Sequence, residues 1–407
     1  MTDIDETALP GFPLRRARPE EIPAEYELMR EKGIGRARLP TGQIVWVIAN
    51  LEYARLVLSD RRFSADKTRA DFPKLSARAL DKLKHFAPFL PNLDGPEHLQ
   101  ERKSISGYFS GTRLAKMRPR IQQAIDEVVD EIARMPERPV DLVPHLSVAA
   151  AWRMQEILLG IPTEELAKVR TYTEELLVRS DTSALEEAAA ARLHGHLDGV
   201  LAEKENDLGD DLISHRISHY LQKTGRVDRG ETASLLHLLT VGNHKTIATL
   251  ISLGVAELLR NPADRRLLLT EPDRMAGAVS EIVRYYSLND ATPMRVALED
   301  VWVGETLFRA GDGVALPLVL ANRDTALCPD ANSLDLLREE SGARHIAFGH
   351  GPHRCLAHAL APLQLEIVYL TLFRRIPDLR LAIPEEELRF TYHSPQACGP
   401  VELPVTW

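Results

Sequence analysis

The chain has 407 residues and a mass of 45.5 kDa, which is long enough for a large core and for one to three domains. Hydrophobic residues make up 44% and charged residues 27%, a balance that excludes a disordered or fibrous protein. The formal net charge of −9 excludes the overall basic character of a nucleic-acid binder.

The cysteine content and the N-terminal segment indicate the compartment. Cys328, Cys355 and Cys398 are too few and too scattered for a disulfide framework, which favours a reducing environment. Residues 1–16 have neither the basic nor the apolar region of a secretory signal, and no run of 18 apolar residues occurs. We therefore expect a cytoplasmic protein, without a membrane span, that begins with a flexible segment over about residues 1–16.

The predicted elements change in character along the chain. The first is a strand within 38–50, where Ile44, Trp46 and Ile48 alternate onto one face, and helical spacing begins near Leu51. From about 96 to 261 nearly all signals are helical, including an apolar stripe over 121–132. A helix over about 231–260 is apolar on most sides and is expected to cross the core.

Short strands return after Arg295, at 301–303 and 314–318, separated by Gly304 and by Gly311 to Gly313. The chain has no internal repeat, low-complexity segment or Gly/Ser linker. We therefore predict a mainly α fold with small β-sheets, in a single domain over 1–407.

The densest group of possible metal ligands lies between His345 and His358, with four His and one Cys within 14 residues. A structural zinc site would need a second pair of ligands further along, and none is present. Cys355 follows a Gly/Pro-rich loop and opens an apolar stripe, which predicts a sulfur at a helix N-terminus. Such a position favours a thiolate, one of the ligands by which proteins hold heme iron, whereas an isolated cysteine is more often a small core residue.

The ten residues Phe348-Gly-His-Gly-Pro-His-Arg-Cys-Leu-Ala357 resemble the heme-binding loop of the cytochrome P-450 superfamily, in its soluble bacterial form. Further landmarks follow the family's order from Asp94 to His358, so the resemblance covers most of the chain. It implies the cytochrome P-450 fold, with the long central helix crossing above the heme. It also implies heme b (iron protoporphyrin IX) as cofactor, Phe348 in the heme-binding loop and Cys355 as the axial ligand.

Other family landmarks imply a structural group of charged residues and the residues that bind the heme propionates. Glu281 and Arg284 resemble the Glu-x-x-Arg motif, and the resemblance adds Arg338 to a structural charge triad before the cysteine loop. The heme propionates need cationic or hydrogen-bonding partners. By resemblance, these partners are His98, Arg102, Arg295 and His353.

The segment Gly242-Asn-His244-Lys245-Thr246 resembles the family's oxygen-activating pattern Ala-Gly-x-acid-Thr. In the family, the acid and the Thr support proton delivery, which is general acid chemistry. Here Thr246 is present but Lys245 replaces the acid. A protonated Lys cannot accept a proton, so a neutral Lys245 or His244 would have to relay one. Alternatively, Lys245 points away into a salt bridge.

Two further departures follow the cysteine. Ala357 replaces the usual Gly, and Pro362 falls inside the predicted helix. Because Pro lacks an N–H, we expect Pro362 to kink that helix without removing a heme ligand.

Three functions remain open at this point. The first is a monooxygenase that oxidises a small organic substrate in natural-product biosynthesis. With no Gly-x-Gly-x-x-Gly fingerprint for a fused reductase, its electrons would come from a ferredoxin and a ferredoxin reductase. The second is radical oxidative coupling without oxygen insertion, suggested by the missing acid. The third is a heme-binding sensor without turnover, against which Thr246 argues.

Charge also suggests partners. Arg113, Lys116, Arg118 and Arg120, with Arg354, form a candidate face for an acidic ferredoxin. Lys245, together with the basic residues of 67–84, suggests an anionic substrate.

We expect a monomer. The substrate loops are predicted at 63–90, 166–183, 288–294 and 393–397.

Overall fold

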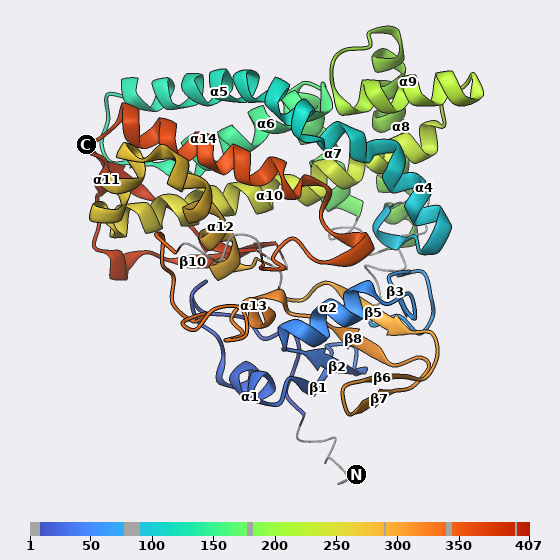
Figure 1. Cartoon of the computed structure of the whole chain (residues 1–407). Helices are drawn as coiled ribbons and strands as arrows, with labels where there is room; N and C mark the ends of the chain where they lie inside the picture. Colours follow the sequence, from blue (N-terminus) through green and yellow to red (C-terminus); the bar gives the residue numbers. More distant parts are fainter. Residues whose placement is uncertain (1–8, 77–89, 177–181, 289, 339–343, 395–396) are drawn as a thin grey trace. The chain divides into compact units, whose positions relative to one another are not determined.

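In the computed structural model, the described residues are 9–76, 90–176, 182–288, 290–338, 344–394 and 397–407 (Figure 1). Parts of all four predicted substrate loops lie outside these ranges. The chain is mainly helical with small sheets, which confirms the predicted fold class. It divides into two compact units. The sheet unit comprises Met1–Leu80, Gly277–Cys355 and Phe390–Gly399, and the helical unit comprises Asp81–Ala276, Leu356–Arg389 and Pro400–Trp407.

The sheet unit is built on a five-stranded sheet in the order β1-β2-β8-β5-β3. Strand β2 pairs antiparallel with β1 and parallel with β8, and β5 pairs antiparallel with both β8 and β3. The bounds are β1 Ile34–Arg38, β2 Ile44–Ile48, β3 Phe63–Ser64, β5 Met294–Ala297 and β8 Gly313–Ala315.

Both faces of β2 pack against hydrophobic residues. Val45 and Val47 belong to one core cluster, while Ile48 and the half-buried Trp46 belong to the cluster on the other side. The Trp46 indole Nε1 donates to Asp312 Oδ2 at 2.9 Å, which satisfies its one polar group. The predicted strand is confirmed, but it buries both faces rather than one.

The sheet unit also contains helices and two-stranded sheets. Strand β6 is the predicted strand over 301–303, and it pairs antiparallel with β7, which was not predicted. The predicted strand over 314–318 ends at Ala315, and helix α13 begins at Leu318. Pro317 explains this end, because it cannot donate to a strand and suits a helix start. The bounds are α1 Ala24–Lys32, α2 Leu51–Ser59, α12 Met275–Tyr286, α13 Leu318–Ala321, β6 Val301–Val303, β7 Thr306–Phe308, β10 Phe390–Ser394 and β11 Ala397–Pro400.

Within the segment over 1–16 that is expected to be flexible, the structure describes residues 9–16, and two of them are buried. Phe12 is 2% exposed and lies in a core cluster. The buried Arg16 guanidinium pairs with Asp290 at 2.8 Å. Residues 1–8 lie outside the described residues.

The helical unit contains the long predicted run of helices (Figure 1). In α5, the predicted stripe over 121–132 is buried, as amphipathic packing requires. A small sheet of β4, β12 and β9 completes the unit. The bounds are α4 Gly95–Ser106, α5 Gly111–Arg134, α6 Ala149–Leu159, α7 Thr163–Glu174, α8 Ser183–Asn206, α9 Leu212–Thr224, α10 Arg229–Arg260, α11 Pro262–Thr270, α14 Leu360–Arg375, β4 Val140–Asp141, β9 Arg380–Leu381 and β12 Pro404–Thr406.

Helix α10 is the predicted long helix, and it packs against α6, α7, α8 and α14. Its N-terminus is capped by Asp228, whose carboxylate accepts from Glu231 N at 3.0 Å. Every residue from Ile247 to Leu258 is buried. At Gly254 the helix approaches Tyr369 so closely that a Cβ would lie 2.0 Å from the phenol oxygen. This glycine permits the contact in which Tyr369 Oη donates to Leu250 O at 2.7 Å.

Candidate functional site

The loop before Cys355 is closed by backbone hydrogen bonds. Cys355 N donates to Phe348 O at 2.8 Å, and Arg354 N donates to Gly351 O at 3.1 Å. Gly349 and Gly351 have φ of 75° and 68°, values that favour glycine. A Cβ at Gly351 would lie 2.5 Å from Leu58 O, so glycine is also required sterically. The loop therefore holds Cys355 in a defined backbone position.

Cys355 differs from the other two cysteines, all three of which lie within the described ranges. Its side chain is exposed, whereas Cys328 and Cys398 are buried. Burial raises the pKa of the Cys398 thiol to about 11, which keeps it protonated. Cys355 is thus the cysteine that could bind an external group.

The helix predicted to start at Cys355 begins later. A 3₁₀ turn covers Leu356–His358, and α14 starts at Leu360. Pro362 therefore stands in the first turn of α14, where a missing N–H costs no helical hydrogen bond. The predicted kink at Pro362 is wrong, and Cys355 precedes a single turn rather than an α-helix.

The histidines around Cys355 do not form a metal centre with the described residues, since no group of three or more His, Cys, Asp or Glu is arranged to hold an ion there. His345 lies 3.2 Å from Ser280 Oγ, and burial lowers the pKa of His345 to about 4. Phe348 is half-buried and packs near the His345 ring, with 6.1 Å between centroids.

Glu281, Arg284 and Arg338 come together in the sheet unit, as the resemblance implies. Glu281 and Arg284 are fully buried and form two hydrogen bonds of 2.7 Å, and Arg338 Nε lies 3.1 Å from Glu281 Oε1. Arg284 Nη1 also donates to Asn322 O and Ala331 O, which ties α12 to the chain that leads to the cysteine loop. Glu281 and Arg284 are buried and their polar groups are hydrogen-bonded, so the role of the triad is to hold the backbone before the cysteine loop and not to bind substrate.

The four residues assigned to the heme propionates are divided between the units. His98 and Arg102 lie one turn apart on α4, with His98 buried and Arg102 half-buried. Arg295 is buried on β5, where its Nη1 donates to Met294 O at 2.7 Å, and His353 is half-buried in a 3₁₀ turn.

Lys67 is a further basic residue whose pKa responds to Arg295. Burial lowers the pKa of the half-buried Lys67, and the Arg295 guanidinium lowers it further. Pairing of β3 with β5 explains why the chain after Ser64 lies beside Arg295. The sequence signal was weak, because Lys67 is one of several basic residues in its loop.

The segment around Thr246 has exposed residues on one side of α10 and a buried histidine on another. Gly242, Lys245 and Thr246 are exposed, and Thr246 Oγ1 donates to Gly242 O at 3.2 Å. His244 is 3% exposed and faces α6 and α7. Its Nδ1 lies 2.9 Å from Arg170 Nη1, and its ring centroid lies 4.0 Å from that of Trp152.

Because Arg170 can only donate, His244 Nδ1 must accept, and the ring is neutral with its proton on Nε2. Burial and the nearby charges of Arg170 and Lys245 lower the pKa of His244 to about 3. The suggested relay through His244 is therefore not supported, since its accepting nitrogen is already bonded. Arg170 was missed in the sequence because its role depends on contacts between α7 and α10.

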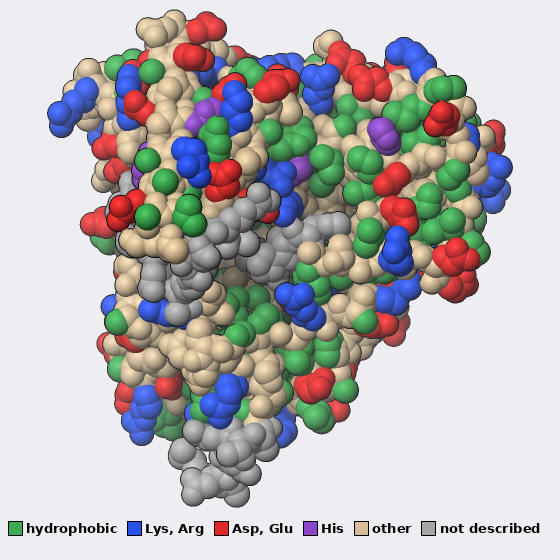
Figure 2. Space-filling view, turned by 180° about the vertical axis from the view of Figure 1, so that it is seen from behind, with side chains coloured by type: hydrophobic (Ala, Val, Ile, Leu, Met, Phe, Trp, Pro, Cys, Tyr) green, Lys and Arg blue, Asp and Glu red, His purple; other side chains and the backbone are tan. Residues whose placement is uncertain are grey.

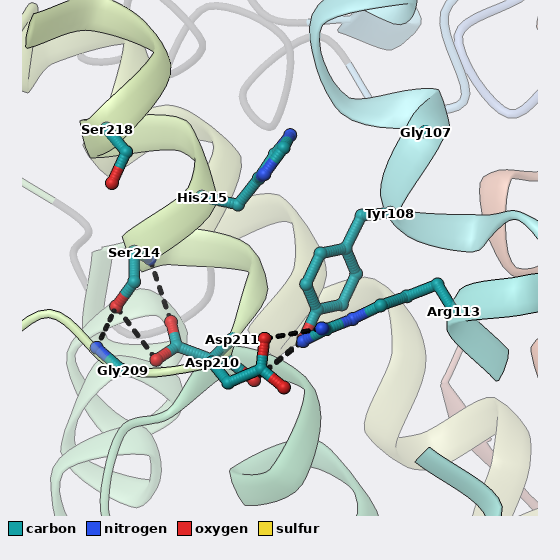
Figure 3. Close-up of a pocket in the computed structure, with 9 residues that line it drawn as sticks. All are labelled: Gly107, Tyr108, Arg113, Gly209, Asp210, Asp211, Ser214, His215 and Ser218. Carbon is teal, nitrogen blue, oxygen red and sulfur yellow. Dashed lines mark hydrogen bonds and ion pairs between the residues drawn. The ribbon is translucent and has the colours of Figure 1, made fainter. Parts of the chain in front are cut away.

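The basic residues of α5 are partly paired, and Arg113 lines a polar pocket of about 250 Å³ (Figure 3). Arg113 pairs with Asp210 and donates to Tyr108 Oη at 2.9 Å, while Asp211 accepts from Ser214 N at 2.8 Å. Arg118 pairs with Glu366 at 2.6 Å. Lys116 and Arg120 remain exposed. The pocket's polar groups thus mainly satisfy one another.

The face shown in Figure 2 carries basic and acidic side chains interspersed rather than in a field of one sign. Among the helices of the described ranges, none has both the length and the apolar character that crossing a membrane requires.

The family model described as cytochrome P450 matches residues 36–389. The chain is 36% identical to pentalenic acid synthase of Streptomyces avermitilis, over 98% of this chain and 97% of the relative. It is similar to the solved structure of the mycinamicin VIII C21 methyl hydroxylase MycCI from Micromonospora griseorubida, with a TM-score of 0.88 and 31% identity over 98% of this chain and 100% of the other. It is also similar to SgvP, described as a putative thioether synthase in griseoviridin tailoring, with a TM-score of 0.87 and 30% identity over 98% and 100% of the two chains.

These matches extend over nearly the whole chain, and they agree with the glycine-closed cysteine loop and the buried Glu281–Arg284 pair. Members of this family bind heme through a cysteine thiolate. The chain is a heme enzyme that belongs to the cytochrome P450 family.

Proposed function

We propose that Cys355 is the axial thiolate ligand of heme b, and that the enzyme inserts one oxygen atom into a small organic substrate in natural-product biosynthesis. The exposed Cys355 thiol on its closed loop carries this proposal. Bound heme supplies the redox chemistry that activates dioxygen. The similar methyl hydroxylase and pentalenic acid synthase support this class of reaction.

The chain's own residues fit such a cofactor. The exposed thiol is a suitable ligand, and Arg295 and the half-buried Lys67 are basic groups of the kind that a propionate carboxylate requires. We assign His98, Arg102, Arg295 and His353 to the propionates and Phe348 to the packing of the heme-binding loop.

Proton handling at the substrate site is assigned to Thr246. Its hydroxyl is exposed and donates to Gly242 O, and it can still accept a hydrogen bond from water. A protonated Lys245 cannot replace the missing acid as an acceptor. Ordered water, a neutral Lys245 or an acidic group of the substrate would complete the route to Thr246.

The electron donors in this proposal are a ferredoxin and its reductase, as is typical of soluble bacterial relatives. The exposed Lys116 and Arg120 of α5 would attract an acidic ferredoxin. Arg113 and Arg118 contribute less charge there, because carboxylates pair with them.

The reduced carbon monoxide complex tests the ligand assignment. Wild type should show the red-shifted Soret band of thiolate ligation, and this band should vanish in Cys355→His even where heme is retained. Cys328→Ser and Cys398→Ser should preserve the band, since both thiols are buried. Persistence of the band in Cys355→His would refute the assignment.

Lys245 at the acid position and the similarity to a putative thioether synthase favour a second candidate, radical oxidative coupling without oxygen insertion. Turnover under labelled dioxygen separates the two reactions. Label in the product indicates oxygen insertion, and its absence from a coupled product indicates coupling.

A further inference from the structure

Helices α7 and α10 are neighbours in the helical unit (Figure 1). Each contributes a cationic side chain to the region around His244: Arg170 of α7 contacts His244, and Lys245 lies between His244 and Thr246 in the chain. The Arg170 guanidinium is held by neutral groups. Its Nη1 donates to His244 Nδ1 at 2.9 Å, and its Cζ lies 5.3 Å from the Trp152 ring centroid. These contacts orient the guanidinium without neutralising its charge.

Arg170, Lys245 and His244 form a group that we call the cationic cluster, and its positive charges outnumber the negative charge that acts on it. Neither Arg170 nor Lys245 makes an ion pair with a carboxylate of the described residues. Burial lowers the pKa of both groups, and Arg170 lowers that of Lys245 further. Glu174 opposes these shifts by raising both pKa values, so one carboxylate acts on two cations.

Among Arg170, Lys245 and His244, the remaining hydrogen-bonding capacity consists of donors. Ammonium and guanidinium groups have no acceptor. The neutral His244 carries its proton on Nε2, and this buried nitrogen has no hydrogen-bond partner among the described residues. A group that only accepts hydrogen bonds and carries negative charge would complement these donors.

We propose that Arg170 and Lys245 together bind a carboxylate of the substrate. This inference rests on the proposed function and names the substrate class. The carboxylate would accept hydrogen bonds from the exposed Lys245 and from Arg170. Both residues are positioning residues for the substrate. Arg170 lies on α7, outside the family's oxygen-activating segment.

A series of N-alkylimidazoles ending in a carboxylate, and the same series ending in an alcohol, provides probes. The imidazole nitrogen binds heme iron, and varying the alkyl length allows the terminal group to reach the cations. Titration followed by the heme absorption spectrum gives the Kd of each probe. At one or more lengths, wild type should bind the carboxylate at least about tenfold more tightly than the alcohol.

Lys245→Gln and Arg170→Gln should each reduce this preference by about tenfold, and Glu174→Gln should increase it by removing the opposing charge. Lys168→Gln is the matched control, because Lys168 is an exposed α7 cation paired with Glu165 at 2.8 Å. Arg170→Lys keeps the charge if Arg170→Gln is unstable, and it should retain most of the preference. The exposed Lys245 is substituted without disturbing packing.

Equal binding of carboxylates and alcohols at every length would overturn the inference, as would a preference that Lys245→Gln and the Arg170 variants leave unchanged. Both results leave the proposed function intact when the alcohols still bind the iron and the thiolate band is present. Loss of that band from wild type would instead contradict the proposed function itself.

Discussion

At the scale of single residues, the cysteine loop depends on glycine for two separate reasons. Gly351 has a φ of 68°, and a Cβ there would also meet the carbonyl of Leu58 at 2.5 Å. Gly42 has a φ of 87° but no atom within 4 Å of an added Cβ. An added Cβ would therefore cause only backbone strain at Gly42, whereas at Gly351 it would also clash with a neighbouring carbonyl.

Gly351→Ala should therefore displace the loop and reduce heme loading several-fold, with a lower melting temperature. Gly42→Ala should cost only about 1 kcal/mol of stability and leave heme loading unchanged. Heme absorbance per mole of protein and circular dichroism melting measure both effects. Normal heme content in Gly351→Ala would show that the loop can move without loss of the ligand.

At the scale of elements, α12 is joined to the segment before the cysteine loop by the Glu281, Arg284 and Arg338 triad. Arg284 and Glu281 are fully buried, so each requires the other to offset the desolvation of its charge. Glu271 and Arg274 have the same i,i+3 spacing but lie 3.5 Å apart on the surface. Their exposed ion pair should contribute little.

Glu281→Gln keeps the shape of the side chain but removes its charge, leaving Arg284 buried without a counter-charge. We expect a loss of about 3–5 kcal/mol in the free energy of unfolding. Glu271→Gln should change it by less than about 1 kcal/mol. Denaturant titration of both variants decides this, and equal small losses would contradict a stabilising role for the buried pair.

At the scale of the whole molecule, buried neutral histidines make stability depend on pH. Burial lowers the pKa of His237 to about 4 and contributes most to the lowering of the His244 pKa to about 3. His237 Nε2 lies 3.0 Å from Thr173 Oγ1, and the Thr173 hydroxyl donates to Val169 O. His237 Nε2 must therefore donate, which requires a protonated Nε2 but no charge on the ring.

Because the unfolded chain binds protons below about pH 6.5 while these two rings stay neutral in the fold, stability should fall as pH decreases from about 6.5 toward 4. Each histidine should contribute a loss of about 1.5 kcal/mol between about pH 6.5 and 5. His237→Asn should flatten this dependence, whereas substitution of the exposed His145 by Asn should not. Denaturant titrations at several pH values measure the slope, and an unchanged slope in His237→Asn would exclude this contribution.

Local sequence patterns were sufficient to predict much of the secondary structure and the loop that carries Cys355. Period and composition predicted the strand at Ile44, the stripe of α5 and the length of α10, because burying an amphipathic face imposes its spacing on the sequence. The family was predicted from the resemblance of the cysteine loop to a known motif, and the positive φ of Gly349 and Gly351 explains why this loop contains glycine at those positions.

Tertiary structure alone decided which side chains share an environment. Pro362 breaks no helical hydrogen bond because α14 starts at Leu360. Phe12 and Arg16 are buried in the core. Arg170 contacts His244 from another helix. The pairing of β3 with β5 likewise brings the chain before Lys67 to the strand that carries Arg295. Sequence determined which residues could bury apolar surface or bind a ligand, because propensity and turn geometry are local. It could not determine charge partners, tautomers or helix starts, because desolvation and hydrogen bonding depend on neighbours that only folding brings together.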